Sequence, residues 1–278
     1  MSGKLYIVGT PIGNLGDMTV RAVDTLRAVD FIAAEDTRVS LKLLNHFDIK
    51  KPLVSSHKHS TLQCQESIVK RVCDGESCAV ITDAGMPCIS DPGEDLVKMC
   101  CEAGITVEVV PGPTAALSAL AVSGLSTSRF SFEGFLSTAN KPRKTHLEEA
   151  ARSRYTLIFY EAPHKLKATL DDMLEYFGDR KISLCRELTK IHEEIIRTTI
   201  SQAVEYYRVN DPRGEYVLIV EGRQEDESSP ATIEDAVMYA RKLSDSGMKP
   251  SDACRESAKL TGFKKGDIYT AMLEDSDE

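Results

Sequence analysis

Short apolar runs alternate with amphipathic stretches over the first 120 positions. The apolar runs occupy residues 5–9, 31–34, 53–55, 78–82 and 106–110. Between them, apolar residues recur at helical spacing over residues 19–29, 61–73 and 94–103. This alternation predicts parallel strands joined by crossover helices. In open sheets of this kind, ligands bind beyond the carboxyl ends of the strands.

A second series of strands and helices follows a Ser/Thr/Gly-rich break at residues 123–128. We expect strands at residues 130–135, 155–160, 182–185, 195–200 and 216–220. Helical patterns lie at residues 146–152, 165–177 and 201–208. The last three strands have short connections, so we expect a mixed sheet here.

The C-terminal part differs from both series. The polar, acidic segment 225–231 is predicted to be a linker, and helical patterns follow at residues 232–244, 251–261 and 265–273. Two short helices around a turn at Gly262 fit a helix-turn-helix. A helical hairpin that packs on the body or on a second copy fits equally well. We therefore predict two α/β domains, residues 1–122 and 123–224, and a small helical module, residues 232–278.

Composition and charge narrow the class of protein. A chain of 278 residues with 42% hydrophobic residues predicts about two domains of ordinary size. It has no apolar run of about 18 residues and no signal-peptide core at its start, so we expect a cytoplasmic protein with no membrane partner. With 34 basic against 43 acidic residues, the chain does not coat nucleic acid by bulk charge, although a local basic patch stays open.

The eight cysteines form no Cys-x-x-Cys pair, and the histidines do not flank them at zinc spacing. Disulfide bonds are the alternative use of so many thiols. We expect reduced thiols and no metal site.

Three loops at predicted strand ends are rich in Gly and Pro. The first, residues 9–17 (GTPIGNLGD), has neither the G-x-G-x-x-G spacing of a dinucleotide site nor the Gly-Lys-Ser/Thr of a P-loop. The second, residues 82–93 (TDAGMPCISDPG), joins two Asp to rigid Gly and Pro positions, which suits a nucleoside-like ligand. The third, residues 110–117 (VPGPTAAL), predicts a helix start whose amides can meet a polar ligand. A plain turn or helix start is the alternative in each case.

Charged residues follow other predicted strands. They lie in AEDTR (34–38), SHKH (56–59), FYEAPH (159–164) and RELTK (186–190). A base or a substrate clamp is one interpretation of these segments. The alternatives are a helix N-cap by Asp36 or Thr37 with a surface ion pair, a solvated loop, and ordinary turns with charged side chains.

Taken in chain order, these motifs resemble the tetrapyrrole-methylase-like superfamily. The resemblance covers about residues 4–222 and rests on eight collinear segments, GTPIGNLGD, AEDTR, TDAGMPCISDPG, VVPGPTAALSAL, FEGFL, FYEAPHK, CRELTK and GEYVLIVEG. Within the superfamily, the chain most resembles the ribosomal RNA small subunit methyltransferase I branch, whose three-helix tail it matches. Pigment methylases carry Gly-Asp-Pro-x-x-(Tyr/Phe)-Gly after the fourth strand, where this chain has Asp83-Ala84-Gly85.

The resemblance implies S-adenosylmethionine in a cleft between the two α/β domains of a homodimer, with no metal. It implies 2′-O-methylation of a cytidine ribose in small-subunit (16S-type) ribosomal RNA at the decoding centre, on naked RNA or on the assembled subunit. Carried over by motif, it assigns the cofactor site to Pro11, Asp83, Ala84, Gly85, Pro87, Ile89, Thr114, Ala115, Tyr160, Glu161, Arg186 and Glu187.

Methyl transfer to a ribose hydroxyl needs positioning of the reactants and benefits from a base. Glu35, Asp36 and His57, at the ends of neighbouring strands, are the candidate bases, and Arg38 is a candidate phosphate clamp. Seven basic residues against three acidic ones between residues 136 and 167 predict an RNA contact. Its densest part contains Lys141, Arg143 and Lys144. The alternative is a solvated helix start.

Other functions compete with this hypothesis. A tetrapyrrole methyltransferase is disfavoured by the residues after the fourth strand, the basic cluster and the tail. A non-enzymatic helix-turn-helix protein that senses a ligand is disfavoured by the low basic content of the tail, so we expect no DNA partner. The glycine spacing disfavours an NAD-dependent oxidoreductase.

Overall fold

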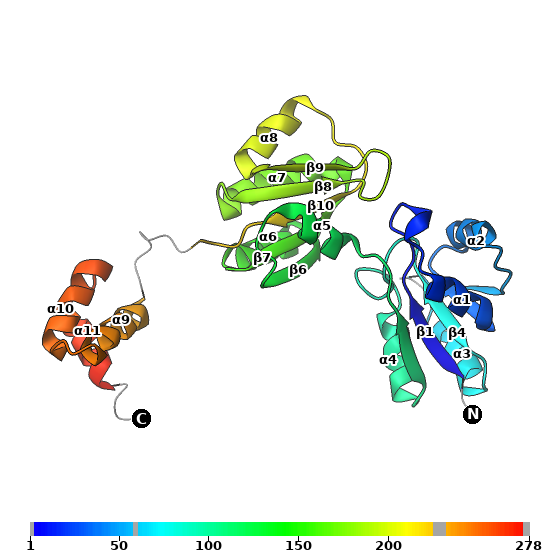
Figure 1. The fold of residues 1–278 in the computed structure, drawn as a ribbon, viewed down its shortest axis with the longest axis horizontal. Helices are drawn as coiled ribbons and strands as arrows, with labels where there is room; N and C mark the ends of the chain where they lie inside the picture. Colours follow the sequence, from blue (N-terminus) through cyan, green and yellow to red (C-terminus); the bar gives the residue numbers. More distant parts are fainter. Residues whose placement is uncertain (1–2, 58–60, 225–231, 275–278) are drawn as a thin grey trace. The chain divides into compact units, whose positions relative to one another are not determined.

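The computed structural model of the chain describes residues 3–57, 61–224 and 232–274, which form two compact units, Met1–Arg223 and Gln224–Glu278. The larger unit contains two five-stranded sheets, and the secondary structure of the smaller unit, over its described residues 232–274, is helical (Figure 1). The expected linker, residues 225–231, lies outside the described residues.

The first sheet is parallel throughout and has the strand order β3-β2-β4-β1-β5. Its strands are β1 (Lys4–Val8), β2 (Phe31–Ala34), β3 (Leu53–Ser55), β4 (Cys78–Ile81) and β5 (Thr106–Val110). Every residue of β2 and of β4 is buried. Strands buried on both faces are continuous apolar runs in sequence, which is why the pattern predicts them well. The expected parallel sheet is confirmed.

Helices connect these strands. They are α1 (Val20–Ala28), α2 (Thr37–His46), α3 (Leu62–Cys73) and α4 (Glu94–Glu102), and a short 3-10 turn, η1 (Leu15–Asp17), precedes α1. The sequence pattern did not predict α2 as a helix. Its buried positions are Ser40 and Leu44, so its inward face is short and partly polar.

The second sheet is mixed, as expected, with the order β6-β7-β10-β8-β9. Its strands are β6 (Phe130–Phe135), β7 (Thr156–Glu161), β8 (Lys181–Arg186), β9 (Glu194–Thr199) and β10 (Tyr216–Val220). Only the edge strand β6 pairs in parallel with its neighbour. The other three pairings are antiparallel.

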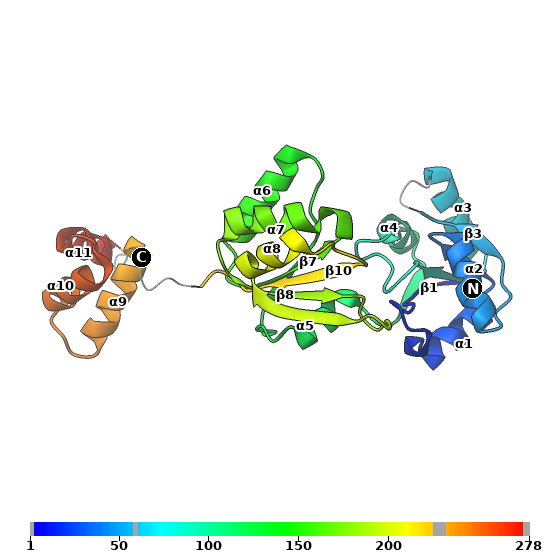
Figure 2. The ribbon, with the colours of Figure 1, turned by 90° about the horizontal axis from the view of Figure 1, so that it is seen from above.

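Helices cover both faces of this sheet (Figure 2). They are α5 (Ala115–Ser123), α6 (Asn140–Ala151), α7 (Pro163–Phe177) and α8 (Ile200–Val209). α5 packs on one face through Ala116, Ala119 and Leu120, and so belongs with the second sheet although it directly follows β5. α6 begins six residues before the predicted position. Pro142 falls in its first turn, where the ring is tolerated because the amide has no partner in the helix.

The smaller unit holds three helices around its own core, α9 (Ile233–Asp245), α10 (Pro250–Thr261) and α11 (Lys265–Glu274). Thr232 and Asp235 form a capping box at the start of α9. Gly262 adopts a left-handed conformation that ends α10, as expected for a glycine stop.

No helix within the described part of the chain is long and apolar enough to cross a membrane. All eight cysteines are free thiols, four of them buried.

Candidate functional site

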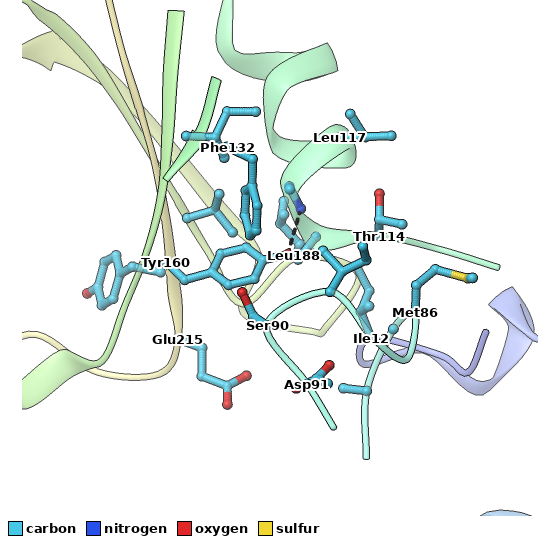
Figure 3. A pocket seen from close by; sticks show the side chains of 18 of the residues that line it. Ile12, Met86, Ser90, Asp91, Thr114, Leu117, Phe132, Tyr160, Leu188 and Glu215 are labelled. Atoms are coloured by element: carbon cyan, nitrogen blue, oxygen red, sulfur yellow. Dashed lines mark hydrogen bonds between the residues drawn. The ribbon is translucent and has the colours of Figure 1, made fainter. Parts of the chain in front are cut away.

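A cavity of about 610 Å³ lies in the larger unit, in the size range of small-molecule sites. The loops after β1 and β4 supply part of its wall, the start of α5 a second part, and the second sheet the rest. In Figure 3, Ile12, Met86 and Asp91 come from the first two loops, Phe132 and Tyr160 come from strands of the second sheet, and Glu215 directly precedes β10.

Backbone contacts hold the first-sheet loops together. Thr10 and Gly85 form an isolated antiparallel bridge, in which the amide of Thr10 donates to Gly85 at 2.9 Å and the amide of Gly85 donates back at 3.1 Å. A Cβ on Gly9 would lie 2.6 Å from the backbone nitrogen of Gly112, so this close approach of two loops requires glycine. The cavity wall is therefore preorganised by main chain.

The loop from Thr82 to Gly93 is unusually strained. Cys88 and Ser90 have φ angles of 71° and 64°, in the left-handed region that non-glycine residues rarely adopt. Such conformations cost free energy and cluster at functional sites. Here they turn a loop of the first sheet so that Ile89, Ser90 and Asp91 line the cavity.

The start of α5 and an aromatic wall face each other across the cavity. The amide of Ala116, in the first turn of α5, donates to the hydroxyl of Tyr160 at 3.2 Å. The rings of Phe132 and Phe135 contact Tyr160 edge-on, with centroids 5.1 and 5.4 Å away. Burial raises the pKa of Tyr160, so its hydroxyl stays neutral at physiological pH.

A charged network forms a further part of the wall. Lys190 donates to Glu187 at 3.0 Å and to Glu215 at 3.4 Å. Burial alone would raise the pKa of Glu187, but the hydrogen bonds from Lys190 and the backbone of Glu215 outweigh it and lower that pKa. The network places two carboxylate side chains around one ammonium group beside the cavity.

Carboxylates also gather at the ends of β2 and β4. Thr82 donates to Glu35 at 2.6 Å. Burial raises the pKa of Asp91 to about 6, and the negative charge of Glu35 adds to the increase. Burial and Glu35 also raise the pKa of Asp83. Asp91 lines the cavity, whereas Asp83 and Glu35 do not.

The AEDTR segment contains the helix cap that was the alternative interpretation. Asp36 is the N-cap of α2 and accepts from the Arg38 amide at 2.8 Å. The Arg38 guanidinium donates to the same carboxylate at 3.1 and 2.6 Å, and these hydrogen bonds hold the pKa of Asp36 far below its ordinary range. So low a pKa makes Asp36 a weak base.

His57 is exposed at the end of β3, next to Lys58 and His59, which lie outside the described residues.

Seven of the twelve residues expected to bind a cofactor line the cavity, namely Ala84, Gly85, Ile89, Thr114, Ala115, Tyr160 and Glu187. The other five do not. Pro11 and Pro87 are buried in the two loops, next in sequence to lining residues. Asp83 is exposed and accepts from the amide of Asp36 at 3.3 Å.

The side chains of Glu161 and Arg186 interact with other residues of the second sheet and its helices. Glu161 is 4% exposed and accepts hydrogen bonds from Thr169 at 2.5 Å and from the Ala162 amide at 2.8 Å. Arg186 lies 3.1 Å from Glu194 on the neighbouring strand. Glu161 is thus satisfied within the fold, whereas the buried Nε of Arg186 makes no hydrogen bond despite its ion pair with Glu194. Sequence alone does not distinguish such internal contacts from ligand binding.

Of the three residues expected to bind RNA on α6, two are exposed and one is largely buried. Lys141 and Lys144 are exposed on α6. The Arg143 side chain is only 15% exposed, and it donates to Asp172 at 2.6 Å and to Thr169 at 2.9 Å. Arg143 thus joins α6 to α7 and is not available to a phosphate.

Sequence reasoning missed several cavity residues, including Asp91, Lys190 and the phenylalanines of β6. Asp91 and Lys190 stand in motifs that had been singled out, TDAGMPCISDPG and RELTK. The segment FSFEGF was a further signal. Phe130 and Phe132 alternate with a polar residue, and this pattern predicts an aromatic face on the strand. Among the described residues, no group of three or more His, Cys, Asp and Glu is arranged to hold a metal ion.

Comparison with known proteins places these features in a family. Residues 4–204 match the profile of the tetrapyrrole (corrin/porphyrin) methylases. The chain is 45% identical over 273 residues to the ribosomal RNA small subunit methyltransferase I of Synechocystis sp., covering 98% of each chain. It is 46% identical over 222 residues to the protein of that name from Thermotoga maritima, covering 80% of this chain and all of that relative.

Solved structures of low sequence identity share the fold. Uroporphyrin-III C-methyltransferase from Thermus thermophilus, complexed with S-adenosyl homocysteine, matches with a TM-score of 0.57 at 17% identity, over 79% of this chain and 92% of that one. Diphthine synthase matches with a TM-score of 0.62 at 11% identity, over 80% and 91%. The expectation of a tetrapyrrole-methylase fold with two α/β sheets and a helical tail is confirmed.

Proposed function

Because the chain belongs to the ribosomal RNA small subunit methyltransferase I family of the tetrapyrrole methylases, we propose that it methylates the ribose 2′-hydroxyl of a cytidine in small-subunit ribosomal RNA, at the decoding centre. The chain is a methyltransferase, and its cofactor is S-adenosylmethionine. The observation that carries the proposal is the cavity with its preorganised loops, aromatic wall and carboxylates.

The residues of the cavity fit this cofactor. S-adenosylmethionine supplies a methyl group on a positively charged sulfonium. The purine ring needs apolar surface, which Ile12, Ile89 and Leu188 provide. A cation needs negative charge or aromatic faces. The wall carries three carboxylates, those of Asp91, Glu187 and Glu215, against one ammonium group, that of Lys190.

Asp91 is the best-placed base for the hydroxyl proton. It lines the cavity, and its pKa of about 6 leaves it ionised at neutral pH while it still accepts a proton readily. Thr82 lies beside both Asp91 and Glu35 and lowers the pKa of Asp91 in part, which supports the ionised form. Glu35 and His57 are the other candidates. Asp36 suits a structural role, because it caps α2 and pairs with Arg38.

The RNA contact in this proposal rests on exposed basic residues. Lys141 and Lys144 project from α6, and the Arg38 side chain is 88% exposed at the start of α2. Contacts to phosphates are strengthened by the release of counterions. We place the reaction in the cytoplasm and in a homodimer, which is the arrangement that the family resemblance implies.

Methyl transfer tests the proposal directly. The protein is incubated with S-adenosylmethionine labelled in its methyl group and with small ribosomal subunits that lack the modification. We expect label in the ribosomal RNA and none in uroporphyrinogen III offered in parallel. Binding of S-adenosylhomocysteine without transfer to subunits or to naked ribosomal RNA would refute the assigned substrate.

A further inference from the structure

Phenylalanines of the edge strand β6 line the cavity while staying largely open to solvent. Phe130 is 43% exposed and Phe135 is 56% exposed, although both belong to the cavity wall. Large aromatic rings are normally buried when nothing binds them. Both rings are therefore more exposed than is usual for phenylalanines that bind nothing.

A β-bulge creates this arrangement. Side chains of a regular strand alternate between its two faces, so Phe130 and Phe132 share a face that Phe135 would not. The register shifts between Phe132 and Gly134, where Gly134 has a φ of 64°. Phe132 then stands opposite Ile158 and Phe135 opposite Tyr160, on the cavity face of β7. Bulges re-aim side chains beside active sites in this way.

Neighbouring contacts hold the re-aimed ring in place. The Tyr160 ring meets Phe135 edge-on at 5.4 Å. A Cβ on Gly134 would lie 3.4 Å from the Ser90 hydroxyl, so the bulge sits directly against the strained loop that carries Asp91. The Phe135 ring is therefore held by Tyr160 of β7, and the bulge beside it lies against the loop that carries Asp91.

The chain segment that carries the rings is rich in basic residues, in contrast to the carboxylates elsewhere in the cavity wall. Between residues 129 and 144 there are four basic residues and one acidic residue. That acid, Glu133, is engaged by His146 at 2.9 Å. Lys141 and Lys144 are exposed at the start of α6, which follows β6 directly in the chain. Exposed aromatic rings interleaved with basic side chains are the combination that binds single-stranded nucleic acid, because bases stack on the rings and phosphates meet the cations.

From these observations we propose that Phe135 provides a stacking surface for an unpaired base of the RNA substrate, with Lys141 and Lys144 contacting neighbouring phosphates. The inference rests on the proposed function and adds that the target segment is bound as a splayed single strand. A base that must reach a cavity has to leave its helical stack, and an aromatic surface at the rim compensates for part of the lost stacking.

Replacement of Phe135 tests the stacking surface. In Phe135→Leu the apolar contact is kept and the ring is lost, whereas Phe135→Trp keeps a ring. A stacked base contributes enough that we expect the KM for small ribosomal subunits to rise about 10-fold or more in Phe135→Leu and to recover in Phe135→Trp. Tyr206→Leu, which removes an exposed ring of α8 outside the cavity, is the matched control and should behave as wild type.

Two further measurements separate the outcomes. The Kd for S-adenosylhomocysteine, from calorimetry, should change less than two-fold in Phe135→Leu. A parallel rise of that Kd with an unchanged KM would assign the ring to the cofactor and overturn the stacking surface. Filter binding of subunits without cofactor gives the same comparison even if the wild-type protein transfers no methyl group, so failure of the proposed function and failure of the stacking surface are distinguishable.

The phosphate contacts have a test of their own. Each phosphate contact to a single strand contributes about 0.7 to the slope of log Kd against log salt. The double variant Lys141→Ala/Lys144→Ala should flatten this slope by more than one unit for subunit binding. An unchanged slope would remove these lysines from the RNA site.

Discussion

At the residue scale, Asp91 combines features that only a functional role explains well. It sits on a strained loop, lines the cavity, and shares its surroundings with a second carboxylate, Glu35. Burial and that negative charge raise its pKa to about 6. Groups whose pKa values are shifted toward neutrality and that face a cavity are candidates for acid–base work.

Asp91→Asn tests the base. In the wild-type enzyme, kcat/KM should fall as the pH drops below about 6, because protonated Asp91 cannot accept the hydroxyl proton. The variant should lose about 10²- to 10⁴-fold in kcat and should lack this acidic limb. Asp95→Asn, a change at an exposed position on α4, is the control. Activity of Asp91→Asn within ten-fold of wild type, with the limb intact, would point to Glu35 instead.

The raised pKa of Asp91 also predicts how the stability of the folded chain depends on pH. The folded chain holds the Asp91 proton more tightly than the unfolded chain, whose pKa is about 3.9. The stabilisation from this group is therefore complete below about pH 4 and is lost as the pH rises through 6. Asp91→Asn removes the buried charge, so its Tm should exceed that of wild type at pH 8 and match it at pH 4. A lower Tm at pH 8 would contradict the raised pKa.

At the scale of elements, a hydrogen-bonded chain ties α6 and α7 to β7. Arg143 donates to Thr169, and Thr169 donates to the buried Glu161. A buried carboxylate without its donors is costly, so the network stabilises this side of the second sheet. Two residues that the sequence placed in binding sites, Arg143 and Glu161, are thus part of the scaffold.

Arg143→Ala and Lys144→Ala should therefore behave in opposite ways. Arg143→Ala should lower the free energy of unfolding by about 1–3 kcal/mol, with little change in subunit affinity at a temperature where the variant is folded. Lys144→Ala, two-thirds exposed, should leave the Tm unchanged and weaken binding at low salt. Thermal denaturation and filter binding of both variants give the comparison. An Arg143→Ala protein of wild-type Tm and reduced RNA affinity would restore the phosphate role.

The elements also show what could be predicted from sequence and what could not. All ten strands were predicted from the sequence, most directly β2, β4 and β10, which are buried throughout and are continuous apolar runs. The start of α6 could not be located, since Asn140–Lys144 has no apolar periodicity. The choice between Asp83 and Asp91 depends on positive φ angles at Cys88 and Ser90, and the position of Phe135 depends on a bulge. Both are backbone features that residue types alone do not specify.

At the scale of the whole molecule, the candidate site lies entirely within the larger unit. Every residue of the cavity wall falls between Ile12 and Val217, and the three helices of the tail enclose a separate core. The Thermotoga maritima relative aligns over its full length with 222 residues of this chain, about the size of that unit. The tail is therefore expected to be dispensable for cofactor binding.

A chain ending at Arg223 should bind S-adenosylhomocysteine with a Kd within two-fold of the full-length protein, by calorimetry. Its Tm should be unaffected by loss of the tail, because the two units have separate cores. A tenfold weaker Kd with an unchanged Tm would mean that the tail contributes to the cofactor site. Comparing the KM for subunits in the two forms then shows whether the tail binds RNA.

The proposed reaction is transfer of a methyl group to the 2′-oxygen of a cytidine ribose in small-subunit ribosomal RNA. The most direct measurement is nuclease digestion of subunits methylated by the protein, followed by mass spectrometry of the nucleosides. We expect one new product, 2′-O-methylcytidine, which Asp91→Asn should form about 10²- to 10⁴-fold more slowly. A methyl group found on a base, or on no nucleoside at all while S-adenosylhomocysteine binds normally, would contradict it.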